Sequence, residues 1–132
     1  MTRHEMRQNA LLLIFMRNFN KGEVDEMIAT AQECEMVEVN DQVLALFSGV
    51  EEKKDWLDTE ISKYLVGWSI SRISKVSLSV LRIAMYEIFF CEDIDTDIAI
   101  SEAVKLAQEY SLKDDVSFVN GVLSSVAKEL KK

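Results

Sequence analysis

The densest run of hydrophobic positions lies at residues 76–90, with the sequence VSLSVLRIAMYEIFF. Leu78, Leu81 and Met85 recur at spacings of three and four, and further apolar residues widen this stripe until little of the surface is polar. A helix that is apolar almost all round is covered by neighbours on several sides. The pattern predicts a central helix, with its two charged residues, Arg82 and Glu87, each reaching an edge or a partner.

Amphipathic stretches before and after this segment predict further helices. We expect them from the N-terminus to about residue 19, then over 23–36, 41–65 and 95–110, and from residue 114 or 115 to the C-terminus. Thr2 and Glu5 have the spacing of a capping box. Gly22 is suited to a left-handed helix end, and Asn40 or Asp41 to a helix start.

Residues 69–80 nearly alternate between polar and apolar positions, a pattern typical of a half-buried strand. No second strand is available to pair with it, and a lone strand would leave its backbone groups unmatched. Ile70, Ile73 and Val76 also fit a helical spacing. We therefore expect a short helix or turn near residues 69–74.

The composition favours one all-helical domain over residues 1–132. The chain contains no proline and four glycines, and 48% of its residues are hydrophobic. Its formal net charge of −8 argues against broad electrostatic binding of nucleic acid. A local basic site is still possible, because Arg3, Arg7 and Arg17 outnumber Glu5 near the N-terminus.

The sequence offers little catalytic chemistry. His4 is the only histidine, and there is no glycine-rich phosphate loop. Cys34 and Cys91 lack metal-binding spacing, so we expect two reduced thiols in the core. We predict no catalytic residue, metal or cofactor. No run of apolar residues is long enough to span a bilayer, and no signal peptide is visible, which predicts a cytoplasmic protein.

Two features suggest binding. Arg3 and Arg7 lie one turn apart and are followed two turns later by Phe15, and cations beside a ring suit single-stranded nucleic acid. Ordinary surface arginines with a core phenylalanine would explain the same residues. The second feature is FVNGVL at residues 118–123, where Asn-Gly lies inside a helical stripe and Phe118 falls off its inner face, so that Phe118 should be partly exposed.

Several motifs resemble the NusB family of transcription antitermination factors. They are TRHEMRQNALLLIF at the start, LRIAMYE in the centre, AISEAVKLAQEY after it and FVNGVL near the end. The stretch LFSGVEEKKDWLDTEISKYLVGWSISRISKV is also similar to the family's middle section. The resemblance covers nearly the whole chain.

The resemblance implies a fold of about seven helices in two packed bundles. It implies binding to single-stranded boxA RNA jointly with NusE, a small-subunit ribosomal protein. Such a complex would join the transcription elongation complex and support processive transcription of ribosomal RNA operons. A homodimer that covers the RNA face is also possible, through exposed apolar groups among Leu11, Leu12 and Met16.

The resemblance also implies roles for particular residues. The RNA-binding candidates are Arg3, His4, Arg7, Phe15, Arg82 and Phe118. The candidates for binding the protein partner are Ser77, Arg82 and Asp114. For one site to form, we expect the arginine-bearing start of the first helix and Phe118 to lie side by side.

The chain departs from the family pattern near these residues. Ser77 and Ser79 stand where charged groups are common, Ser101 replaces a usual asparagine, and a usual proline near Asp95 is missing. With few cations, RNA affinity should be weak and salt-sensitive without the partner. Two alternatives remain: a protein-interaction module without RNA contact, and the accessory domain of an RNA methyltransferase, which no part of this chain supports.

Overall fold

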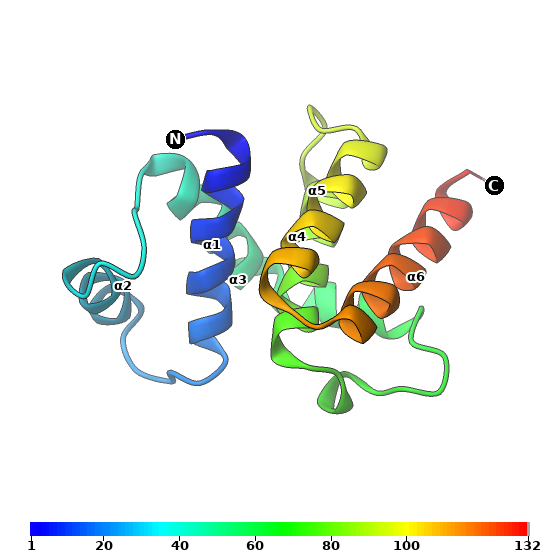
Figure 1. Ribbon diagram of the computed structural model, residues 1–132, viewed down its shortest axis with the longest axis horizontal. Helices are drawn as coiled ribbons and strands as arrows, with labels where there is room; N and C mark the ends of the chain where they lie inside the picture. Colours follow the sequence, from blue (N-terminus) through cyan, green and yellow to red (C-terminus); the bar gives the residue numbers. More distant parts are fainter. Residues whose placement is uncertain (132) are drawn as a thin grey trace. The chain divides into compact units, whose positions relative to one another are not determined.

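The computed structural model describes residues 1–131, and these form an all-helical protein (Figure 1). Its elements are α1 (Arg3–Arg17), α2 (Val24–Glu33), α3 (Asp41–Ser62), a 3-10 turn η1 (Ile70–Arg72), α4 (Lys75–Phe90), α5 (Thr96–Tyr110) and α6 (Lys113–Leu130). The described residues contain no strand, which confirms the all-helical prediction and the turn expected near residues 69–74.

The chain divides into two compact units within α3. The N-terminal unit, Met1–Glu52, holds α1, α2 and the start of α3; the C-terminal unit begins at Lys53 and holds the rest of α3 with α4, α5 and α6. Each unit is described by itself below. Among the described residues, no helix has the length and apolar character that crossing a membrane would require.

The capping box at the start of α1 is present as predicted. The Thr2 hydroxyl accepts from the Glu5 backbone N–H at 3.0 Å, and the Glu5 carboxylate accepts from the Thr2 N–H at 2.9 Å. Asn40 caps α3 in the same way, since its side-chain oxygen accepts from the Val43 N–H at 2.9 Å. These side chains satisfy backbone donors that a helix start leaves unpaired.

The loop between α1 and α2 is held by Arg17. Its Nη1 donates to the carbonyls of Asn20 and Gly22 at 2.8 and 2.7 Å, and its Nε lies 3.5 Å from Glu51. The prediction for Gly22 was wrong, because the only glycine with positive φ among the described residues is Gly67, at +77°. Arg17 stabilises this loop by hydrogen bonds, and positive φ angles occur instead at Glu35 after α2 and at Gly67 after α3.

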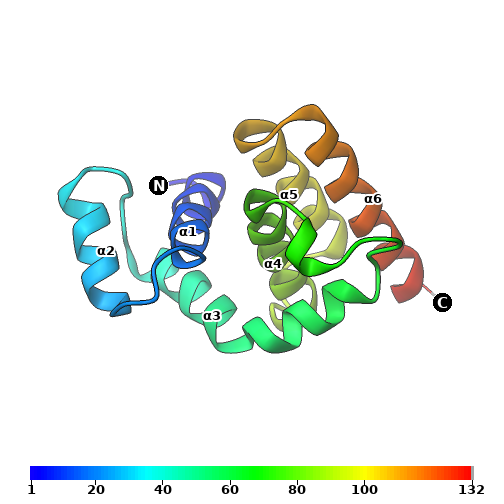
Figure 2. The same ribbon diagram turned by 90° about the horizontal axis from the view of Figure 1, so that it is seen from below.

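Helix α4 is the centre of the C-terminal unit, as its sequence predicts. It packs against α5 and α6, which also pack against each other, and Figures 1 and 2 show the three helices side by side. Ten residues of α4 are buried, and four of them are polar or charged. These four are Ser77, Ser79, Arg82 and Glu87.

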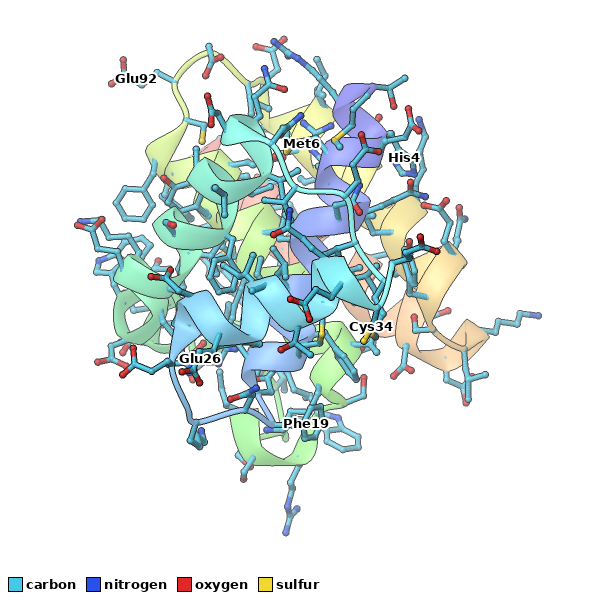
Figure 3. All side chains as sticks on the ribbon, turned by 90° about the vertical axis from the view of Figure 1, so that its left-hand side faces the viewer. His4, Met6, Phe19, Glu26, Cys34 and Glu92 are labelled. Carbon is cyan, nitrogen blue, oxygen red and sulfur yellow. The ribbon has the colours of Figure 1, made fainter. Side chains whose placement is uncertain are left out.

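Two side chains that fall on the apolar stripes of the helices expected over 41–65 and from residue 114 or 115 to the C-terminus, and so were expected to face inward, lie at the surface. Trp56 is 43% exposed and packs edge-to-face on Phe89 and Phe90, while Leu130 is 46% exposed near the end of α6. Cys34 is also exposed, in the turn after α2 (Figure 3), whereas Cys91 is half-buried. Neither cysteine forms a disulfide, and only Cys91 approaches the core position expected for the pair.

Candidate nucleic-acid interface

The N-terminal unit offers two of the predicted side chains at the start of α1. Arg3 is exposed and His4 is half-buried, and Figure 3 labels His4 at this end of the helix. Glu5 is exposed beside them, and the hydrogen bond from the Thr2 backbone holds the pKa of the Glu5 carboxyl below its usual value. The local positive charge is therefore partly offset by a carboxylate that stays ionised to lower pH than usual.

Arg7 does not extend this basic surface. Although it lies one turn after Arg3, only 2% of it is exposed. A buried guanidinium cannot reach a phosphate unless it leaves its present surroundings. The sequence pattern predicted a pair of surface arginines, and the structure places one at the surface and one inside.

Phe15 lies further along α1, at a shallow apolar groove of the same unit. Its ring meets that of Phe19 edge-to-face, with centroids 5.2 Å apart, and Phe19 is 65% exposed. The groove has a volume of about 400 Å³ and is lined by α1, α2 and the loop between them. Phe15 is therefore half-buried on the wall of a groove. The sequence left open whether Phe15 is a core residue or a surface ring, and its position is intermediate between the two.

Arg82 of the C-terminal unit is held in a bidentate ion pair. Its Nε and Nη2 each donate to one oxygen of Asp58 on α3, both at 2.8 Å. The Arg82 side chain is 5% exposed and that of Asp58 is 26% exposed. Arg82 thus reaches a partner, as predicted for a charge on this helix, and that partner lies within the chain.

Ser77, predicted to contact a protein partner, is buried. It is 1% exposed, and its hydroxyl has no hydrogen-bond partner among the described residues. A side chain in this position offers no surface to another molecule. Asp114, a further partner-binding candidate, is exposed in the first turn of α6.

Phe118 is half-buried, as its place off the inner stripe of α6 predicts. Its ring meets that of Trp68 edge-to-face, with centroids 6.2 Å apart. The two rings line a groove of about 470 Å³, which also includes Arg72, Asp114 and Asp115. Sequence reasoning missed Trp68, and the available signal was a tryptophan directly after Gly67 at a point where the helical spacing breaks off.

The predicted residues are thus divided between the two units. Arg3, His4 and Phe15 lie in the first, and Arg82, Asp114 and Phe118 lie in the second. Within the second unit, the structure brings Asp114 and Phe118 to one groove, which Arg82 does not line. The expected contact between the start of α1 and Phe118 joins the two units and stays a prediction.

These features define an all-helical protein with exposed rings and cations at its surface. The sequence profile of the NusB family matches residues 4–128, and the chain therefore belongs to the NusB family. The transcription antitermination protein NusB of Ruminiclostridium cellulolyticum is 42% identical over 97% of this chain and 90% of the relative.

Solved structures agree with this assignment. The NusB structure of T. maritima is 30% identical and superposes with a TM-score of 0.83, covering 98% of this chain and 92% of that one. A chain from a crystal structure of the antitermination factors NusB and NusE in complex with dsRNA has a TM-score of 0.82 over 96% of each chain. That chain is 24% identical, so the likeness concerns the fold alone. The all-helical, NusB-like fold that the resemblance implied is confirmed. The described residues form six α-helices and one 3-10 turn, where about seven helices were expected.

Proposed function

We propose that this protein binds boxA-type single-stranded RNA jointly with the ribosomal protein NusE, and so supports processive transcription of ribosomal RNA operons. The observation that carries the proposal is the family match over residues 4–128 to transcription antitermination proteins. A chain with the same fold occurs in a structure of NusB and NusE in complex with dsRNA, and a joint complex with NusE and RNA is compatible with that fold. The elongation complex would be the larger assembly in which they act.

The direct RNA contacts in this proposal come from exposed or half-exposed residues. Arg3 and His4 would contact phosphates, and Phe15 and Phe118 would stack on bases. Asp114 would meet NusE. The buried residues Arg7, Ser77 and Arg82 would act through the chain itself, by positioning the helices that carry the contacts.

The small number of exposed cations near the proposed contacts explains why a second protein would be required for tight RNA binding. Log affinity for RNA falls with log salt in proportion to the number of phosphates that are neutralised. With Arg7 and Arg82 buried on a chain of net charge −8, few cations are left to do this. NusE would then supply part of the missing contacts.

The test is a fluorescence anisotropy titration of labelled boxA RNA with this protein, with NusE and with both. We expect weak, salt-sensitive binding to the protein alone and much tighter binding with both. Arg3→Ala and Phe118→Ala should weaken the joint complex. Matched controls are Lys21→Ala, an exposed cation of the N-terminal unit, and Phe90→Ala, an exposed ring outside the Phe118 groove.

The burial of two arginines also favours an alternative, a protein-interaction module without RNA contact. In that case the protein would bind NusE, and RNA would bind no more tightly with both proteins than with NusE alone. That outcome would refute the RNA assignment and leave the partner assignment standing.

A homodimer stays a prediction, and less exposed apolar surface supports it than the sequence suggested. Leu11 is 2% exposed, and Leu12 and Met16 are half-buried, so the apolar surface expected on α1 is largely inside.

A further inference from the structure

The shallow groove of the N-terminal unit between α1, α2 and their joining loop, which we call the α1–α2 groove, exposes large apolar side chains. Phe19 is 65% exposed and Met36 is 56% exposed, and both line the groove (Figure 3 labels Phe19 on this face of the unit). Met27 and Ala31 of α2 line it as well and are 5% and 2% exposed. Apolar side chains that lie together in water are typical of a surface that another molecule covers.

Methionine forms much of the α1–α2 groove. Three of the chain's six methionines line it, namely Met16, Met27 and Met36. A methionine side chain is unbranched and flexible, so a surface built from several of them can adapt to apolar side chains of different shapes. Such surfaces are used by proteins that accept the apolar face of an amphipathic helix. The volume of about 400 Å³ has room for a few large side chains and not for a folded domain.

The charges around the groove are negative. Glu23 and Glu26 line it, and no Lys, Arg or His among the described residues does so. Over residues 23–36, which hold α2 and its flanks, the sequence has five acidic residues and no basic one. In the joining loop, Arg17 is held by backbone carbonyls, which leaves Lys21 as the exposed cation there. The groove therefore repels a phosphate and attracts a cation.

We propose that the α1–α2 groove binds a basic amphipathic helix of a partner protein. Apolar side chains three and four positions apart on that helix would contact Phe19 and Met36, and Lys or Arg beside them would meet Glu23 and Glu26. A symmetric pair of copies of this chain fits the groove poorly, because it would place the same acidic residues against each other. The inference goes beyond RNA binding with NusE and does not depend on it.

The methionines can report on the groove directly. The full chain is prepared with carbon-13 in its methionine methyl groups and titrated with a designed peptide of about 14 residues, which forms about four helical turns. The peptide has leucines three and four positions apart and lysines elsewhere. We expect it to shift the methyl resonances of the three groove methionines, Met16, Met27 and Met36. The other three lie outside the groove and serve as internal controls, namely Met1, Met6 and Met85.

Substitution of Phe19 tests the apolar part of the proposal. In fluorescence anisotropy with the labelled peptide, Phe19→Ala should lower the affinity by about tenfold to a hundredfold, which is what burying one large apolar side chain represents. Phe90→Ala is the matched control, because Phe90 is an exposed ring of the C-terminal unit, and it should leave the affinity nearly unchanged. Phe15 is kept unchanged, because its ring has a separate proposed contact with RNA.

Substitution of the acidic residues tests the charge selection. Glu23→Gln with Glu26→Gln should lower the affinity by about threefold to tenfold at low salt, as expected for two exposed ion pairs, and the loss should shrink as salt is added. Asp25→Asn with Glu33→Gln removes the same charge from exposed positions of α2 outside the groove and should cost less. Circular dichroism and thermal unfolding would verify that each variant is folded.

Several outcomes would overturn the proposal. One is that the peptide fails to bind, or that it shifts the control methionines and leaves the groove methionines unchanged. Equal affinity for a peptide of the same composition in scrambled order would mean that charge alone attracts it, and equal affinity for a peptide with glutamates in place of lysines would remove the charge selection. If boxA RNA shifts the groove methionines and the peptide does not, the groove is an RNA site. If these resonances change with protein concentration alone, a second copy occupies it.

The proposed function is tested separately from this groove. None of these peptide readouts requires RNA or NusE, so a failure of RNA binding would leave the groove assignment standing, and a failure of peptide binding would leave the RNA assignment standing.

Discussion

The ion pair between Arg82 and Asp58 allows a quantitative test of the C-terminal unit. Asp58→Ala removes a carboxylate that accepts two hydrogen bonds of 2.8 Å from a buried guanidinium. Removing one partner of a fully buried pair costs about 3–5 kcal/mol, because the remaining charge loses its compensation. The Asp58 side chain is 26% exposed, so water can replace part of that compensation. We therefore expect a loss of about 2–3 kcal/mol in the free energy of unfolding.

The loss would be measured by urea unfolding followed by circular dichroism. In a thermal scan, it corresponds to a midpoint lowered by about 6–12 °C for a chain of this length. Asp55→Ala is the matched control, since Asp55 is an exposed aspartate one turn earlier on α3, and it should change the free energy of unfolding by less than about 0.5 kcal/mol. Equal effects of the two substitutions would refute the reasoning.

A double variant separates the pair from its members. Arg82→Met with Asp58→Ala removes both charges and retains an unbranched apolar chain at position 82. Replacing buried ion pairs by apolar residues is often neutral or stabilising. The double variant should thus be more stable than the sum of the two single losses predicts, and strict additivity would mean that the two side chains are not coupled.

The remaining predictions concern α1 and α4. Because the pKa of Glu5 is lowered in the folded chain, its contribution to stability is fully present above its ordinary value of 4.5 and is lost as the pH falls through the lower folded value. The difference in thermal unfolding midpoint between the unmodified protein and Glu5→Gln should therefore be largest near pH 7 and should disappear at low pH. A difference that does not depend on pH would contradict this cause. Ser77→Ala removes a buried hydroxyl without a hydrogen bond among the described residues, so it should raise the free energy of unfolding by about 1 kcal/mol in urea titrations, and a loss would show that the hydroxyl has a partner.

The elements of the fold could be predicted from the sequence because local patterns determine them. The apolar stripe of residues 76–90 gave the central helix, and Thr2 with Glu5 gave the start of α1. The error at Gly22 came from a side-chain contact, since Arg17 binds the carbonyls of Asn20 and Gly22, three and five residues later, and helical periodicity does not indicate such a contact. Trp56 fits the apolar stripe of α3, which predicts an inward position, but its ring lies at the surface against Phe89 and Phe90 of α4.

The candidate site was less predictable, because burial decides which charges can act. Arg3 and Arg7 look equivalent in sequence, and only the packing around α1 distinguishes the exposed one from the buried one. Arg82 has a predicted partner, but the sequence could not identify Asp58, which lies 24 residues away. Phe118 was found because it departs from a helical stripe, whereas Trp68 lies in a loop where no periodicity applies.

The two cysteines have a practical consequence. Cys34 belongs to the N-terminal unit and Cys91 to the C-terminal one, and neither forms a disulfide. Their unequal accessibility allows a first probe to be attached at Cys34 under mild conditions and a second at Cys91 under harsher ones. The natural chain can thus carry a donor and an acceptor dye, one on each half, and energy transfer between them would report any movement of the halves as RNA and NusE are added.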